Sequence, residues 1–210
     1  MSRQAIIAVA IILVLLLLYL GNNENYSIHK TSGGHRYHLL SKYENRKKAG
    51  ELFNWLNHKM FTFLEHLKRK YNINHTEDLN SPFNRSSIVR RILMNYNYEK
   101  LFENIPTGKN GTSFTTNKGD KLHLCIRTKD NPGIFEDKNS IIFVAVHELA
   151  HMGNIYWGHN NDFWAIFKFL LAEAISIGLY IPIDYGLNPI KYCGLAVDYN
   201  PYFDDQLMKV

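Results

Sequence analysis

Cysteine is scarce in this chain. Its 210 residues include two, Cys125 and Cys193. Their wide separation excludes a zinc site built on paired Cys-x-x-Cys ligands, and their small number excludes a scaffold held mainly by disulfides. Two alternatives stay open for them: one disulfide, if the domain lies outside the cytoplasm, or two buried thiols.

A strong charge of one sign is also lacking. The sequence has 24 Lys and Arg against 19 Asp and Glu, a formal net charge of +5. Two short basic clusters, Arg46 to Lys48 and Lys68 to Lys70, could contact anionic lipid headgroups or nucleic acid. Such clusters are more often an exposed helix face, so nucleic acid is not expected as a partner.

One long hydrophobic run stands at the start of the chain, from Ala5 to Leu20. As a helix it would be about 24 Å long, against about 30 Å for a typical hydrocarbon core, so it is either a short transmembrane anchor or a signal segment. The bulky Tyr19 suits a signal cleavage site poorly, which favours the anchor. We therefore expect residues 5–20 to enter a lipid bilayer, within an N-terminal anchor over residues 1–21. The protein would be a single-pass membrane protein of a host or virion membrane.

The side of the membrane on which the rest of the chain lies stays open. Basic residues after the run favour a cytoplasmic domain. Four Asn-x-Ser/Thr sequons favour a lumenal or extracellular one, and they begin at Asn25, Asn74, Asn84 and Asn110. Their number is too close to chance to decide.

The remaining chain predicts one α+β domain over residues 47–210, after a polar linker over residues 22–46 with no apolar period. With 46% hydrophobic and 20% charged residues, the composition is that of a globular protein. Apolar residues recur at three and four from Lys47 to Lys70, which predicts an amphipathic helix, and a shorter helix is expected from Ser86 to Tyr96. Residues 106–121 are rich in Gly, Asn and Thr and predict a loop or hairpin.

Three further elements follow. The alternation from Lys121 to Arg127 predicts a strand. A helix is expected from Ile141 to about Asn154, with Asn139 or Ser140 as its cap. Another is expected from Asp162 to about Ile177, capped by Asn160 or Asn161, before an irregular tail.

The first of these two helices carries His147-Glu148-Leu149-Ala150-His151. Residues four apart lie on one helix face, so His147 and His151 can direct their imidazoles at one cation. Glu148 is rotated by about a third of a turn, which places its carboxylate beside the cation, where it can accept a proton from water. The motif interrupts an apolar segment, and buried imidazoles and a carboxylate need partners, which a metal supplies.

A catalytic zinc ion needs three protein ligands and one open position. The best candidate for the third ligand is His159, eight residues after His151 and directly after Gly158, where a turn could bring the chain back. Asp162 and Glu173 on the next helix are rivals, although Asp162 also suits a helix start.

Together with Gly158-His159 and Phe163-Trp164, the His-Glu-x-x-His helix resembles the WLM and SprT-like zincin-type metallopeptidases. The wider context, Leu124 to Arg127 and Tyr192 to Gly194, is similar to uncharacterised WLM-related proteins of algae and large DNA viruses. The eight-residue gap before His159, with Asn154 where metzincins have glycine, departs from the metzincin pattern.

This resemblance implies a zincin-like fold that binds Zn²⁺ through His147, His151 and His159, with Glu148 as general base. It also implies that the strand around Leu122 to Arg127 is the sheet edge beside which an extended peptide substrate lies. The residue that stabilises the oxyanion is left open among Tyr156, Tyr185, Tyr192, Tyr199 and Arg127.

Three functions remain in competition. The first is a membrane-anchored zinc metallopeptidase that hydrolyses a peptide or protein substrate. The second is a catalytically inactive structural protein of a membrane or virion that keeps the zincin fold. The third is a DNA–protein crosslink protease, which an apolar N-terminal run does not suit.

Overall fold

The computed structural model describes residues 7, 11–12, 26–31, 33–73, 78–108, 111–208 and 210. The predicted anchor therefore lies almost entirely outside the described residues, as do the asparagines of three of the four sequons. Within the described part of the chain, no helix is long and apolar enough to cross a membrane.

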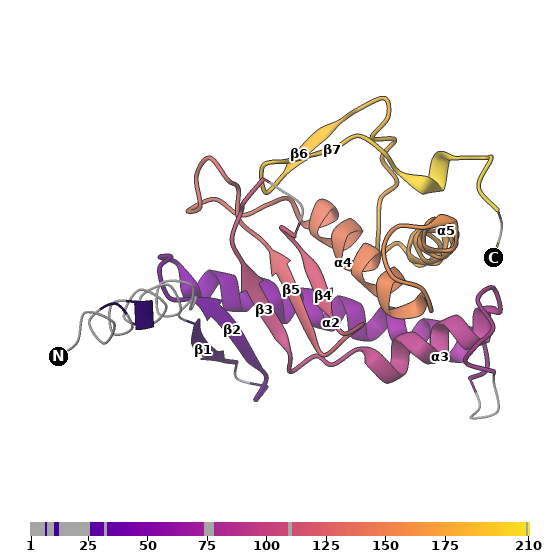
Figure 1. The fold of residues 1–210 in the computed structure, drawn as a ribbon, viewed down its shortest axis with the longest axis horizontal. Coiled ribbons are helices and arrows are strands. Elements are labelled where there is room, and N and C mark those ends of the chain that lie inside the picture. The colour runs from indigo at the N-terminus through magenta and orange to yellow at the C-terminus, as the bar shows by residue number, and fades with distance from the viewer. Residues whose placement is uncertain are drawn as a thin grey trace.

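A five-stranded mixed sheet forms one layer of the domain (Figure 1). Its strands lie in the order β1-β2-β3-β5-β4, where β2–β3 and β3–β5 are parallel and the other two pairs are antiparallel. The predicted α+β class is therefore confirmed. The strand bounds are Tyr26–Lys30 for β1, Arg36–Leu40 for β2, Leu101–Asn104 for β3, Phe114–Thr116 for β4 and Lys121–Cys125 for β5.

The expectation of a polar linker over residues 22–46 is wrong where β1 and β2 form a hairpin of the sheet. The sequence signal was weak because β1 is largely polar and partly exposed. On β2 the core-facing side chains are Tyr37, Leu39 and Leu40, and the alternation breaks at the adjacent pair of leucines.

The edge of the sheet also differs from the expectation. β5 lies between β3 and β4, so the strand around Leu122 is internal and the edge is β4. β4 has three residues and belongs to the segment predicted as a loop or hairpin, which turns into β5 through Asn117 and Lys118, both at positive φ.

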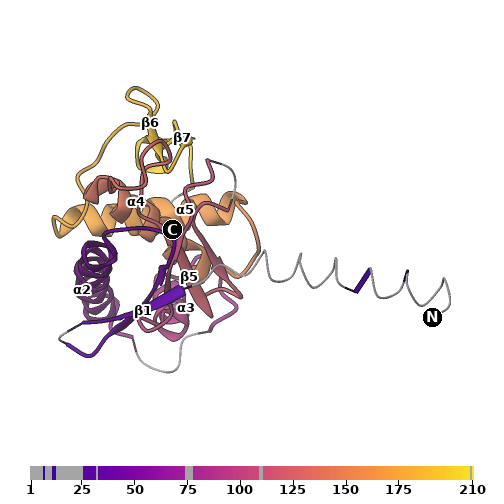
Figure 2. The same ribbon diagram turned by 90° about the vertical axis from the view of Figure 1, so that its left-hand side faces the viewer.

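Two helices precede the central part of the domain much as their periodicity predicts, and α3 packs against α2 and α4. α2 spans Arg46–Lys70 and α3 spans Arg85–Asn95, each within a residue of the expected bounds. α2 packs beside β1 and β2 and buries Phe53, Met60 and Phe63 (Figure 2). The side chain of Asn84 caps α3 by accepting from the Ser87 N–H.

The central helix α4 spans Lys138–Gly153 and packs against α3, α5 and β4. Its residues are apolar on most sides, so it is buried over nearly its whole length. Neither predicted cap is right. The helix starts three residues earlier than expected because the Asp137 carboxylate accepts from the Ser140 N–H at 3.0 Å.

α5 spans Asn161–Ser176 and is capped by Asn160, one of the two predicted residues. The expected irregular tail instead contains a hairpin of β6 (Ile190–Tyr192) and β7 (Leu195–Val197), then a short 3₁₀ helix over Pro201–Phe203. Cys193 in the hairpin turn forms a disulfide with Cys125 at the end of β5. Of the two alternatives for the cysteines, the structure has the disulfide.

Candidate metal centre

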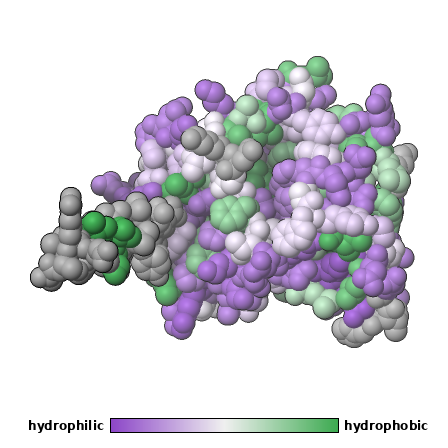
Figure 3. All heavy atoms as spheres, viewed as in Figure 1, coloured by the Kyte–Doolittle hydropathy of each residue, from purple (hydrophilic) through white to green (hydrophobic). Residues whose placement is uncertain are grey.

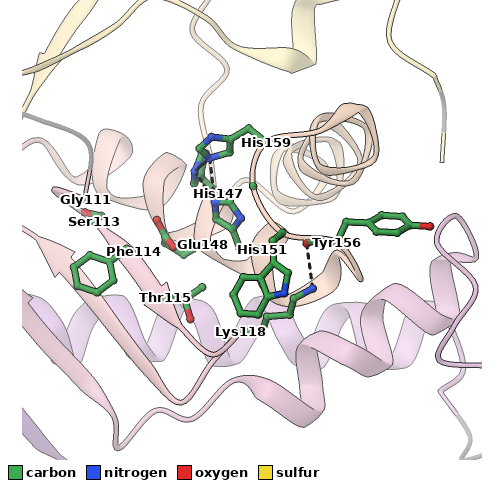
Figure 4. A pocket seen from close by; sticks show the side chains of 12 residues that line it. Gly111, Ser113, Phe114, Thr115, Lys118, His147, Glu148, His151, Tyr156 and His159 are labelled. Atoms are coloured by element: carbon green, nitrogen blue, oxygen red, sulfur yellow. Dashed lines mark hydrogen bonds between the residues drawn. The ribbon is translucent and has the colours of Figure 1, made fainter.

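Three imidazoles meet at one point above α4. The Nε2 atoms of His147 and His151 lie 3.2 Å apart, and the Nε2 atom of His159 lies 3.0 Å from each (Figure 4). They are the one group of three or more His, Cys, Asp or Glu in the described residues placed to hold a metal ion. The predicted ligand set is therefore brought together in space.

The turn between α4 and α5 returns the chain so that His159 faces the helix. Asn154, fully buried, donates from its Nδ2 to Asn160 Oδ1 at 3.0 Å, and that oxygen also accepts from the Phe163 N–H at 2.9 Å. Gly158 has a φ of 77°, a conformation that other residues adopt at a cost. One buried amide thus connects the end of one helix to the start of the next.

Phe163, on the first turn of α5, packs against the whole triad. Its ring centroid lies 4.8, 4.4 and 4.6 Å from those of His147, His151 and His159. Phe163 is completely buried, so it gives the three imidazoles a rigid apolar support. The Trp164 ring adds a second contact to His159 at 5.5 Å.

The arrangement fits a metal ion better than it fits hydrogen bonds between imidazoles. A neutral imidazole carries one N–H, so three converging Nε2 atoms cannot all find donors in one another. Burial lowers the pKa of all three side chains, to about 4 for His151, so the neutral form with a free lone pair is favoured. A tetrahedral zinc ion with bonds of 2.0–2.1 Å separates its nitrogen ligands by about 3.3 Å, close to the spacing here.

Glu148 lies beside the triad on the side facing β4 (Figure 4). It is 2% exposed, and its Oε2 atom has no hydrogen-bond partner among the described residues. Burial raises the pKa of Glu148 to about 8, although the backbone N–H of Thr115 opposes the shift. A cation at the triad would lower that pKa, because an opposite charge favours the ionised carboxylate.

A pocket of about 260 Å³ opens over the triad and Glu148. Phe114 and Thr115 of the edge strand form one wall, and the turn at Tyr156 and Trp157 forms the other. Lys118 also lines it, donates to the Asn154 and Tyr156 carbonyls and lies over the Trp157 ring. Sequence reasoning missed Lys118, whose only signal was its place in a Gly- and Asn-rich turn.

The rival third ligands lie elsewhere. Asp162 lies on the first turn of α5, where it is partly buried. The Glu173 carboxylate is engaged by Lys70 at 2.8 Å, His66 at 2.9 Å and Tyr71 at 2.7 Å. Neither belongs to the group that could hold a metal.

Two of the five oxyanion candidates do not line the pockets at the triad. Arg127 is fully buried, and its Nε atom pairs with Glu103 Oε1 at 2.5 Å. Its guanidinium group also lies over the rings of Tyr43 and Phe135. Tyr185 is buried against Phe143. The three candidates that do line a pocket are Tyr156, Tyr192 and Tyr199.

Comparison with known proteins places these residues in a wider context. The model of the WLM domain matches residues 57–182. Uncharacterized protein R325 of Acanthamoeba polyphaga mimivirus is 28% identical over 202 residues, covering 94% of this chain and 98% of its own length. Uncharacterized protein 136R of Invertebrate iridescent virus 6 is 40% identical over 90 residues, 42% of this chain and 50% of that protein. A crystal structure of a Wss1 mutant from Saccharomyces cerevisiae aligns with a TM-score of 0.45 and 19% identity, covering 68% of this chain and 92% of the other.

Proposed function

Because the chain belongs to the WLM domain family, we propose that it is a zinc metallopeptidase in which His147, His151 and His159 hold the metal. One observation carries the proposal: three Nε2 atoms within 3.2 Å of one another stand beside a buried carboxylate in an open pocket. The sequence resembles proteins of large DNA viruses, as expected, and the two viral relatives named above are uncharacterised.

The roles of the residues follow from their positions. A zinc ion, when bound, would act as a Lewis acid that lowers the pKa of a water molecule and polarises the carbonyl of the substrate. Glu148 accepts the proton of the attacking water and passes it to the leaving amine. Its buried position, with one oxygen unpartnered, keeps the carboxylate available for this transfer.

The edge of the sheet beside the triad is suited to binding an extended peptide. β4 is hydrogen-bonded to β5 on one side, and its residues Phe114 and Thr115 line the pocket. We propose that the substrate adds to this edge as a further strand, so that backbone hydrogen bonds hold the scissile bond over His147 and Glu148.

We further propose that residues 5–20 anchor the enzyme in a lipid bilayer of a host or virion membrane. The Cys125–Cys193 disulfide supports a catalytic domain on the oxidising side, because disulfides persist outside reducing compartments. The substrate would then be a protein or peptide at that surface.

The test is hydrolysis of a random peptide mixture by the purified zinc-loaded full chain and by its Glu148→Gln variant. The variant should keep about one zinc ion per chain and lose cleavage by about 10²-fold or more. Glu51→Gln, at an exposed position on α2, is the matched control and should cleave normally.

Each alternative has its own outcome. A zinc-loaded wild-type chain that cleaves nothing would identify a structural protein with a retained fold. Cleavage that requires added DNA, with binding that weakens steeply as salt rises, would identify a crosslink protease.

A further inference from the structure

A second pocket of about 280 Å³ adjoins the triad on the side away from Lys118. It shares His147, Glu148 and His159 with the first pocket. Its other walls come from α4, α5 and the β6–β7 hairpin, and Figure 3 shows apolar side chains in the hollow between the hairpin and α4. Whatever fills this pocket therefore lies directly beside the proposed reacting centre.

The lining of this pocket is mostly apolar. The side chains that face it include Val144, Trp164, Phe167, Leu195 and Val197. No Lys or Arg belongs to its described lining, whereas Glu148 and Asp198 do. An acidic group would meet the carboxylate of Asp198 there with no Lys or Arg to pair with, whereas a neutral apolar group would only leave water.

The size of the pocket is compatible with a bound side chain. A volume of about 280 Å³ that opens into the peptide-binding pocket suits one large side chain projecting from a bound peptide.

The hairpin wall is held in place before anything binds. Cys193 is fixed by the disulfide to Cys125, and its N–H donates to Glu136 Oε1 at 2.6 Å. The Tyr192 hydroxyl donates to the Cys125 carbonyl. At the far end, the Tyr199 ring meets Trp164 of α5 edge-on, with centroids 5.1 Å apart. A preformed wall of this kind lowers the entropy cost of binding.

We propose that this pocket receives a large apolar side chain, aromatic or branched aliphatic, of the substrate residue next to the scissile bond. The C-terminal hairpin is then the element that determines specificity. The cleavage part of this inference rests on the proposed peptidase function, whereas the binding part does not.

The binding experiment needs neither zinc nor hydrolysis. Methyl NMR signals of Leu195, Val197 and Val144 in the full chain are followed while N-acetyl-phenylalanine amide, N-acetyl-alanine amide or N-acetyl-aspartate amide is added. The phenylalanine amide should shift these signals and bind at least about tenfold more tightly than the alanine amide. The aspartate amide should not bind.

Two variants and a matched control locate the binding. Val197→Trp fills the pocket and should abolish the shifts at Leu195 and Val144. Leu195→Asn keeps the branch point but replaces two methyl groups with a polar amide, and it should weaken binding by about tenfold. Lys191→Trp places the same bulk on an exposed residue of the hairpin outside the pocket and should bind like wild type. Equal shifts with all three amides, or binding that survives in Val197→Trp, would overturn the proposal.

Cleavage of a peptide library by the zinc-loaded chain separates this inference from the proposed function. Preference for large apolar residues at one position beside the cut, replaced by preference for glycine and alanine in Val197→Trp, supports both. Cleavage without such a preference overturns the pocket assignment and leaves the peptidase standing. Selective binding of the phenylalanine amide by a chain that cleaves nothing supports the pocket and overturns the peptidase.

Discussion

The side chain of Asn154 donates to the side chain of Asn160 across 3.0 Å and so closes the turn that carries His159 to His147 and His151. Asn154 also caps the end of α4 and accepts from the Tyr156 N–H at 3.2 Å. The three-residue ligand set therefore depends on an amide that does not itself contact the metal position.

Replacing this amide should weaken the metal site. Asn154→Ala removes the hydrogen bonds to Asn160 Oδ1 and from the Tyr156 N–H, which should lower the free energy of unfolding by about 1–3 kcal/mol. Zinc affinity should fall by about 10–100-fold, the usual cost of losing a group that orients ligands. A competition titration against a chelator measures this, with Asn161→Ala at an exposed neighbouring position as control. Wild-type zinc affinity in Asn154→Ala would refute the role of the turn.

The disulfide should contribute strongly to stability. Cys125 and Cys193 are 68 residues apart, and closing a loop of that length stabilises by about 4 kcal/mol in the chain-entropy model. The midpoint of urea unfolding of the wild-type chain should therefore move to a lower urea concentration when a reductant is added. The Cys125→Ser/Cys193→Ser double variant should have the lower stability even without reductant, and adding reductant should not change it. A wild-type chain indifferent to reductant would mean that the bond does not form.

Glu173 should make stability depend on pH. Its burial alone would raise the pKa, but hydrogen bonds from Lys70, His66 and Tyr71 outweigh burial and lower the pKa below its ordinary value. A lowered folded-state pKa stabilises the protein above the unfolded pKa, about 4.3, and the stabilisation is lost as the pH falls through the folded value.

The variant Glu173→Gln should therefore be less stable than wild type by about 1 kcal/mol at pH 7, since Lys70 is about half exposed. The difference should shrink as the pH falls from 5 towards 3. Urea unfolding at several pH values tests this, with the exposed Glu51→Gln as control. A difference that stays constant over this range would contradict the assigned interactions.

The strongly periodic parts of the molecule were predictable from sequence. α2 and α3 follow their apolar spacing, and His147, Glu148 and His151 follow from the helix period alone. The placement of His159 depended on a turn whose signals, Gly158 and a following cap, are local and therefore readable. These predictions succeeded because each depends on residues close together in the chain.

The features that were not predicted depend on contacts between segments that are distant in the sequence. β5 reads as a strand, but nothing local says that the three-residue β4 covers its outer side and becomes the edge. The burial of Arg127 depends on Glu103 of β3, 24 residues away. The second pocket likewise forms only when the C-terminal hairpin is fixed to β5 by Cys193.

The central claim is that three histidines hold one zinc ion, and X-ray absorption at the zinc edge of the purified chain tests it most directly. The account predicts about one zinc per chain with three imidazole nitrogens at 2.0–2.1 Å, and two imidazoles in His159→Ala. A chain that retains no zinc, or whose zinc has sulfur ligands at about 2.3 Å, would contradict it.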